Sequence, residues 1–325
     1  MWTLDFVGVN IYFCNEPKRL MQMSQAEIIE KIQKLKKEKN AVILAHCYQR
    51  VEIDLVADMV GDSLGLSRKA AQTDADIILF AGVSFMAETA KILSPDKKVL
   101  IPRPEAGCFM ADMITPDDLR KFKSEHPGVP VVCYVNSSAE VKAESDICCT
   151  SANAVKVTAS LGAKEVLFIP DKGLGAYVNS QLPDVNVISF SGFCPTHMRI
   201  IPDDIDAMRN KYPDAPVLVH PECRMEVIEK ADYVGSTTGI IDYAEQSKAK
   251  QFIIVTEVGV VDRLNRDNPD KEFILISDKA VCQNMKWNTL EDILISLEKD
   301  LYEVELDSEL SKRALLSIQR MLDVK

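Results

Sequence analysis

The chain has 325 residues, 47% of them hydrophobic and 27% charged, with a formal net charge of −11 and a pI near 5.0. This length suffices for two or three domains, no apolar run is long enough to span a membrane, and the acidic balance argues against nucleic acid or an anionic membrane surface as a partner. Nine cysteines without the close spacing of a disulfide framework are typical of a reducing compartment, so we expect a cytoplasmic protein.

The first 22 residues lie outside the pattern that follows them. They lack the basic start and the small-residue cleavage site of a signal peptide. We therefore expect residues 1–22 to be a disordered extension or to precede the true start, at Met21 or Met23. The folded part is predicted to begin with the helix over residues 23–40.

From residue 41 onward, one succession of predicted elements occurs three times, which is typical of a repeated architecture. Each copy opens with a β-branched apolar strand, predicted at 41–48, 129–136 and 215–222. After a polar turn comes a helix, which begins near residues 61, 150 and 235. A second strand with a short helix behind it begins at 76, 165 and 251. A third strand leads into a loop that carries one cysteine per copy, namely Cys108, Cys194 and Cys282.

Apolar strands without alternation are typical of parallel sheets buried on both faces, and strands that alternate with helices indicate βαβ units. We therefore expect an α/β fold of three homologous three-layer αβα domains, with parallel sheets arranged around a pseudo-threefold axis. The predicted domains are 23–110, 111–196 and 197–285. Residues 286–325 are predicted to be helical and to pack back on the first domain.

The recurrence of one loop cysteine in each copy suggests a metal centre. Zinc usually takes its sulfur ligands in local pairs, which these cysteines lack, whereas an iron–sulfur cluster accepts thiolates that are distant in sequence. Three ligands would leave one iron open to act as a Lewis acid. Three buried thiols without function are the alternative, and it is weakened because the cysteine recurs at the same position three times.

Polar side chains also recur at the ends of the first strand and at the helix starts. Because ligands of parallel α/β sheets bind at the carboxyl ends of the strands, we expect these side chains to surround one cavity. Helix starts with a serine or threonine cap bind anions, which indicates a polyanionic ligand. The candidates for proton transfer are His46, Tyr48, Tyr134, His220 and Glu222. His197 could instead orient the loop of Cys194.

At these residues the chain resembles the quinolinate synthase family. The matching segments are AHCYQ (45–49), GDS (61–63), AGCFMADM (106–113), YVNSSAE (134–140), CTSANAV (149–155), GFCPTH (192–197), VHPEC (219–223), GSTTG (235–239), TEVGVVDRL (256–264) and AVCQNMKWNTLE (280–291). Ten segments in order, over about residues 24–320, are a specific signature.

The resemblance implies a 4Fe–4S cluster held by Cys108, Cys194 and Cys282 with one open iron. It implies condensation of iminoaspartate with dihydroxyacetone phosphate to quinolinate in NAD biosynthesis, with an aspartate oxidase or dehydrogenase supplying the unstable imine. Glu222 and Tyr48 are then assigned to proton transfer, with His46 and His220 positioning carboxylates. The implied substrate-binding residues are His46, Ser63, Tyr134, Val135, Asn136, Ser151, His220, Pro221, Glu222 and Thr237.

Two other functions are alternatives to this one. A diphthamide-synthase-like protein also gathers one cysteine from each of three domains, but it would act on a protein substrate with S-adenosylmethionine. A non-catalytic iron–sulfur redox sensor would need a fourth ligand and no acid–base residues. The small-anion helix starts and the His220-Pro221-Glu222 strand end favour the quinolinate synthase interpretation.

Overall fold

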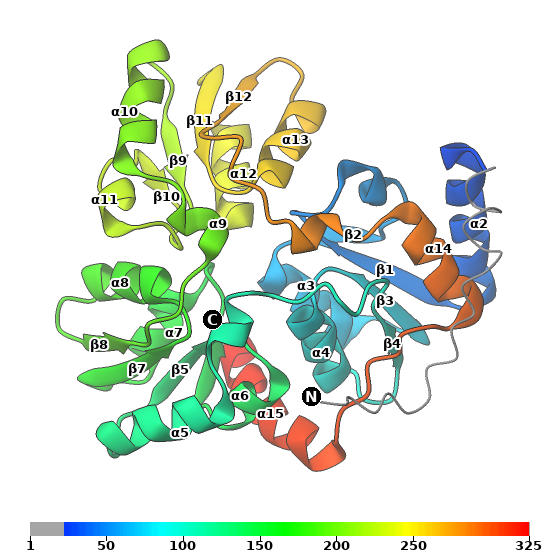
Figure 1. Ribbon diagram of the computed structural model, residues 1–325, viewed down its shortest axis with the longest axis horizontal. Helices are drawn as coiled ribbons and strands as arrows, with labels where there is room; N and C mark the ends of the chain where they lie inside the picture. Colours follow the sequence, from blue (N-terminus) through cyan, green and yellow to red (C-terminus); the bar gives the residue numbers. More distant parts are fainter. Residues whose placement is uncertain (1–22, 325) are drawn as a thin grey trace, which may run out of the picture.

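The computed structural model describes residues 23–324, so the expectation for residues 1–22 lies outside the described part of the chain. Three α/β units surround a common centre (Figure 1). Each unit contains one four-stranded sheet in which all paired strands are parallel. The predicted fold class is confirmed. Within residues 23–324, no helix combines the length and the apolar character that a membrane crossing requires.

The three sheets have the same strand order, with the second strand at one edge and the fourth at the other. The first sheet is ordered β2-β1-β3-β4, with β1 (Ala41–His46), β2 (Met59–Gly61), β3 (Ile77–Ala81) and β4 (Lys98–Leu100). The second is ordered β6-β5-β7-β8, with β5 (Val131–Tyr134), β6 (Ile147–Cys149), β7 (Glu165–Ile169) and β8 (Asn186–Ser189). The third is ordered β10-β9-β11-β12, with β9 (Val217–Val219), β10 (Tyr233–Val234), β11 (Gln251–Val255) and β12 (Glu272–Leu275).

Each sheet thus contains one strand more than the three predicted for each copy. The additional strands are β2, β6 and β10, which lie in segments predicted as polar turns. Their two or three residues are too few to produce a periodic pattern, and only pairing with the neighbouring first strand defines them.

An aspartate fixes this edge strand in the same way in every unit. The residue just before the edge strand, Asp58, accepts a hydrogen bond from the backbone N–H of Ile43 at 2.8 Å. The corresponding bonds are Val131 to Asp146 at 2.7 Å and Val217 to Asp232 at 2.8 Å. This repeated bond aligns the first and second strands, and therefore the residues that end them.

Helices cover the sheets and connect their strands. In the first unit they are α2 (Gln25–Glu38), η1 (Val51–Leu55), α3 (Ser63–Gln72) and α4 (Ser84–Leu93). The second unit has η2 (Ala111–Met113), α5 (Pro116–Glu125), α6 (Ala139–Ala143), α7 (Ala154–Ser160) and α8 (Lys172–Gln181). The third has α9 (Pro195–Met198), α10 (Pro202–Lys211), α11 (Met225–Ile228), α12 (Thr237–Gln246) and α13 (Val258–Asp267). The chain ends with η3 (Asn284–Lys286), α14 (Leu290–Lys299) and α15 (Ser308–Asp323).

The C-terminal segment differs from its prediction in two respects. It is not helical throughout, because residues 300–307 separate α14 from α15 and Asp300 takes a left-handed backbone conformation with φ of 50°. In this break, the backbone N–H of Val304 donates to the carbonyl of Val99 at 2.8 Å, beside β4.

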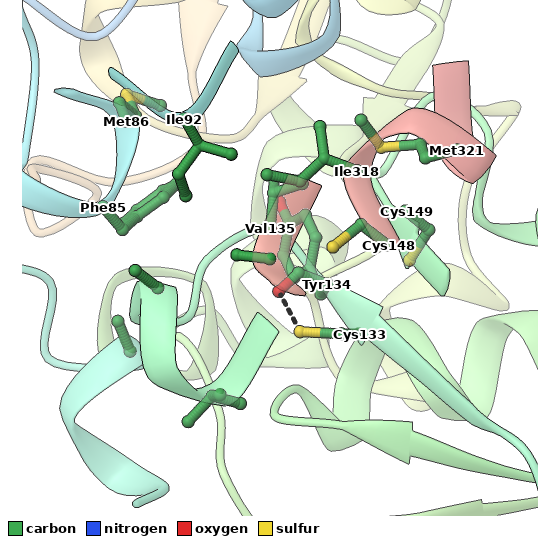
Figure 2. Close-up of a cluster of buried hydrophobic side chains, with 14 of the residues drawn as sticks. Phe85, Met86, Ile92, Cys133, Tyr134, Val135, Cys148, Cys149, Ile318 and Met321 are labelled. Carbon is green, nitrogen blue, oxygen red and sulfur yellow. Dashed lines mark hydrogen bonds between the residues drawn. The ribbon is translucent and has the colours of Figure 1, made fainter. Parts of the chain in front are cut away.

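The two C-terminal helices also pack on different units. The helix α14 contacts the first unit, where its apolar face meets α2 and β3. However, α15 lies mainly against α6 and β6 of the second unit. Figure 2 shows Ile318 and Met321 of α15 beside Cys148 and Cys149 of β6. The helix thereby fastens the end of the chain to the second unit.

Candidate active site

The three loop cysteines are held by the same backbone hydrogen bond. The donors belong to the helices α4, α8 and α13, which follow β3, β7 and β11. In each unit, the first residue of this helix donates its backbone N–H to the carbonyl of the residue two positions before the cysteine. The pairs are Ser84 to Ala106 at 2.8 Å, Lys172 to Gly192 at 2.8 Å, and Val258 to Ala280 at 2.9 Å. Sequence repetition therefore corresponds to a repeated support for each thiol.

All three loops open onto one cavity of about 940 Å³, counted with its open mouth. Nearly all the candidate residues line it. They are Cys108, Cys194, Cys282, His46, Tyr48, Ser63, Tyr134, Asn136, Ser151, His220, Glu222 and Thr237. Two residues do not. Val135 is buried and borders a small adjoining cavity, and Pro221 is also buried.

The helix starts are less uniform than predicted. Only α12 has the expected hydroxyl cap, since the Ser236 side chain accepts a hydrogen bond from the backbone of Gly239 at 3.2 Å. In the first unit the cap of α3 is the carboxylate of Asp62, which does not favour an anion. In the second unit α7 begins only at Ala154, and the Asn153 side chain accepts from the Thr150 backbone. The predicted anion site therefore depends on side-chain hydroxyls more than on three helix ends.

The geometry of His46 and His220 fixes the position of their protons. Nδ1 of His46 accepts a hydrogen bond from the backbone N–H of Tyr48 at 3.1 Å, and Nδ1 of His220 accepts one from Glu222 at 3.3 Å. Burial lowers the pKa of His46 to about 4 and the pKa of His220 to about 3. Both rings are therefore neutral near pH 7 and carry their proton on Nε2, where it is free to be donated.

Glu222 lies at the centre of the acid–base residues. The Tyr134 hydroxyl donates to Oε1 at 2.6 Å, and Nδ1 of His197 lies 2.8 Å from Oε2. Burial on its own raises the pKa of Glu222, but the contacts with His197, His220 and Tyr134 outweigh it and hold the pKa below its usual value. Glu222 is therefore an ionised carboxylate in this cavity.

A continuous chain of side-chain contacts connects Glu222 to Tyr48. Nε2 of His197 lies 2.9 Å from the Thr256 hydroxyl, which in turn lies 3.0 Å from the Tyr48 hydroxyl. Burial raises the pKa of both Tyr48 and Tyr134, so their hydroxyls stay protonated. The chain runs from Tyr134 through Glu222, His197 and Thr256 to Tyr48, and so it draws on all three units.

The three thiols have surroundings that suit iron–sulfur ligation. Burial raises the pKa of Cys108 to about 12 and of Cys282 to about 11, and raises that of Cys194 well above its usual value. In each loop a hydrogen bond from the backbone N–H of the third residue after the cysteine partly offsets this effect. The donors are Ala111, His197 and Met285. N–H groups aimed at sulfur are known to stabilise the thiolate ligands of iron–sulfur clusters.

Ligand atoms of Cys194, His197 and Glu222 also lie within 4.8 Å of one another, as in a site for a single ion. However, Nδ1 of His197 contacts both Glu222 and the Cys194 sulfur, at 2.8 and 3.2 Å. His197 therefore orients these two groups, as its position three residues after Cys194 had suggested, and the three repeated thiols remain the better-suited metal ligands.

Sequence reasoning missed two functional candidates. Thr256 has no recurring counterpart, because Gly82 and Pro170 occupy the equivalent positions at the ends of β3 and β7. Arg199 is an exposed cation that lines the cavity just after α9. No repeat marks either residue, and only the folded geometry brings them to the site.

The fold and site define a class of α/β proteins in which three parallel-sheet units each bring one cysteine to a shared, acid–base-lined cavity. The sequence profile of the family described as Quinolinate synthetase A protein matches residues 30–323. The quinolinate synthase of Alkaliphilus metalliredigens is 53% identical over 303 residues, which cover 93% of this chain and 100% of the relative. That of Dehalococcoides mccartyi (strain CBDB1) is 56% identical over 297 residues, or 91% and 98% of the two chains. That of Methanosarcina barkeri is 52% identical over 303 residues, or 93% and 99%. The chain belongs to the quinolinate synthetase A family.

Proposed function

We propose that this protein is an enzyme of NAD biosynthesis that condenses iminoaspartate with dihydroxyacetone phosphate to quinolinate, phosphate and water. The observation that carries the proposal is the single cavity in which three equivalent cysteines meet the buried contact chain from Tyr134 to Tyr48. The family relationship supports the same reaction.

Neutral donors in the cavity bind the substrate carboxylates and phosphate. The Nε2–H groups of His46 and His220 donate without carrying charge, so they do not compete with Glu222 for a proton. The hydroxyls of Ser63, Ser151 and Thr237 line the same cavity. The Asn136 Oδ1 has no hydrogen-bond partner within the described chain and can accept from an imine or hydroxyl group of the substrate.

Arg199 supplies positive charge to this set of neutral donors. It is exposed and lines the cavity, and it lies in the loop that follows α9. Since a guanidinium binds phosphate in a bidentate manner, we assign Arg199 to the phosphate of the triose.

Glu222 and Tyr48 carry out the proton transfers. The ionised Glu222 accepts a proton from a substrate carbon or nitrogen, while the protonated Tyr48 hydroxyl donates one to a departing or developing oxygen. His197 and Thr256 connect the two groups, so that a proton can return between steps without passing through solvent. Tyr134 holds the Glu222 carboxylate in place.

Cys108, Cys194 and Cys282 would hold the 4Fe–4S cluster. When bound with three cysteine ligands, such a cluster supplies a Lewis-acidic iron for a hydroxyl or carboxylate oxygen. All eight described cysteines are free thiols, which suits the reducing cytoplasm that we propose as its location. We also propose that an aspartate oxidase or dehydrogenase supplies the unstable imine.

The test is anaerobic. The protein is reconstituted with iron and sulfide, supplied with iminoaspartate and dihydroxyacetone phosphate, and assayed for quinolinate. We expect Glu222→Gln to abolish turnover and keep the cluster absorbance, and Cys108→Ala to lose both. Cys149→Ala, which removes a buried thiol in β6 away from the cavity, is the matched control and should keep both. Normal turnover in the Glu222 variant would remove Glu222 from the mechanism, and a cluster without product would refute the proposed reaction.

A further inference from the structure

The segment that joins the third unit to α14 runs along the interface between the third and first units. Figure 1 shows it in orange, between β12 and α14. Asn284 donates to the carbonyl of Gly107, the residue before Cys108, at 2.8 Å. Asn288 donates to the carbonyl of Gly82 at 2.9 Å and to the Gln49 side chain at 3.1 Å. The segment after one cluster cysteine is thus bonded to the loop of another.

Lys286 occupies the middle of this segment and faces the interior. Its Nζ donates to the carbonyl of Tyr48 at 2.6 Å, and its side chain is 16% exposed. The same Nζ lies 3.2 Å from Oε1 of Glu257, whose side chain is fully buried. Lys286 therefore contacts the first unit through the carbonyls of Tyr48 and Gln49, and the third unit through Glu257.

Glu257 extends the connection to the third cluster cysteine. Its Oε1 accepts the backbone N–H of Cys282 at 3.1 Å, and its Oε2 accepts that of Gly259 at 2.7 Å. One carboxylate thus holds the Cys282 loop, the start of α13 and the lysine that contacts Tyr48. The residue at the same helix-cap position is the uncharged Val83 in the first unit. In the second unit it is Asp171, whose Oδ2 has no hydrogen-bond partner within residues 23–324, so among the three described caps the ion pair is particular to the third unit.

The two units approach closely at this point. A Cβ on Gly259 would lie 2.7 Å from the carbonyl oxygen of Cys47 and 3.0 Å from Nζ of Lys286. Because glycine is needed for this contact, the backbone before Tyr48 is held against the start of α13 with no space for a side chain. Lys286 closes the remaining side of the contact.

We propose that Lys286 is a positioning residue that fixes the loop of Tyr48 relative to the loop of Cys282. The role rests on the proposed function, in which Tyr48 transfers protons and Cys282 holds the cluster. Within residues 23–324, Glu257 has no ion pair other than that with Lys286. A buried carboxylate without a cationic partner is strongly disfavoured, so loss of Lys286 frees both loops at once. Positioning errors near 1 Å reduce turnover by up to about 100-fold.

The test compares Lys286→Met and Lys286→Arg with a matched control. The control is Arg266→Met, which removes another contact between the same units, the surface ion pair with Asp54 at 2.6 Å. Amide hydrogen exchange is measured on the apoproteins, and kcat and KM on the reconstituted enzymes.

In Lys286→Met we expect faster exchange over residues 46–50 and around Cys282, and a kcat lowered about 10- to 100-fold with KM changed little. Lys286→Arg should restore most of kcat, and Arg266→Met should resemble the wild type. If Lys286→Met does not fold, Glu257→Gln replaces it, because the substitution removes the ion pair while the amide oxygen can still accept one of the two backbone N–H groups that Glu257 binds.

Wild-type exchange and wild-type kcat in Lys286→Met would overturn the proposal. Equal loss in Lys286→Met and Arg266→Met would also overturn it, because the effect would then be general loosening of the interface. The exchange measurement needs neither cluster nor substrate. A wild-type protein that makes no quinolinate would therefore refute the proposed function while leaving the role of Lys286 to be judged by exchange.

Discussion

Thr256→Val is the substitution that tests the buried contact chain most directly. Thr256 is fully buried and does not line the cavity, and its hydroxyl lies between Nε2 of His197 at 2.9 Å and the Tyr48 hydroxyl at 3.0 Å. Valine keeps the shape of the side chain and removes both contacts. The change therefore interrupts the connection between Glu222 and Tyr48 and leaves the substrate contacts in place.

The expected losses of stability and of kcat follow from the hydrogen bonds that Tyr48 and His197 keep after the substitution. The Tyr48 hydroxyl keeps a hydrogen bond from Thr237 at 3.3 Å, whereas Nε2 of His197 loses its side-chain partner inside the protein. A buried polar group without a partner costs about 1–3 kcal/mol of stability. If protons return through Thr256, kcat should fall by about 100-fold, as in other losses of general acid–base catalysis, with KM unchanged.

The assay is anaerobic quinolinate formation together with urea unfolding of the apoprotein. Thr158→Val is the matched control, because Thr158 is equally buried and its hydroxyl has no hydrogen-bond partner within residues 23–324. We expect that control to keep its activity and its stability. A Thr256→Val enzyme with wild-type kcat would show that protons do not pass through this hydroxyl.

Three further predictions concern pH, charge and packing. Because burial lowers the pKa of His46 to about 4 and of His220 to about 3 from the ordinary value of 6.5, the unfolded chain takes up protons first as the pH falls. The free energy of unfolding should then decrease from pH 6.5 toward pH 4, by up to about 1.4 kcal/mol per pH unit for each histidine, and an equal slope in His220→Asn would contradict this. Arg199→Gln should raise KM for dihydroxyacetone phosphate several-fold at low salt and less at high salt, whereas an unchanged KM would remove Arg199 from phosphate binding. Ile318→Ala, in the buried face of α15, should cost about 2–5 kcal/mol in urea unfolding. Leu316→Ala, at a side chain that is 61% exposed, should cost almost nothing, and equal losses would refute the packing of α15.

Much of the fold could be predicted because the three copies repeat the same local signals. Each copy has apolar strands, short crossover helices and a loop cysteine, and local patterns of this kind specify βαβ units. The edge strands β2, β6 and β10 could not be predicted, because two or three residues become a strand only by pairing. The docking of α15 on the second unit was also missed, since an amphipathic helix does not specify which apolar surface it covers.

In the site, too, residues at positions that recur in all three copies could be predicted, whereas residues without a counterpart in the other copies could not. Nearly all the candidate residues that were named from strand ends and helix starts do line the cavity, because parallel sheets collect these ends at one edge. Thr256 and Lys286 could not be named in this way, because each acts at a contact between units and has no counterpart in the other copies. Sequence periodicity reports what a unit shares with its copies, whereas contacts between units depend on differences among them.

The repeated bond that supports each cysteine loop has a consequence for how such a site could arise. A single copy supplies one thiol, so three separate chains would have to associate symmetrically before a shared centre could form. Such a trimer would present the same residue three times around its axis. Here the equivalent strand ends are His46, Tyr134 and His220, and their differences are possible because the copies share one chain. Covalent linkage allows a symmetric scaffold to surround an asymmetric substrate with three different side chains.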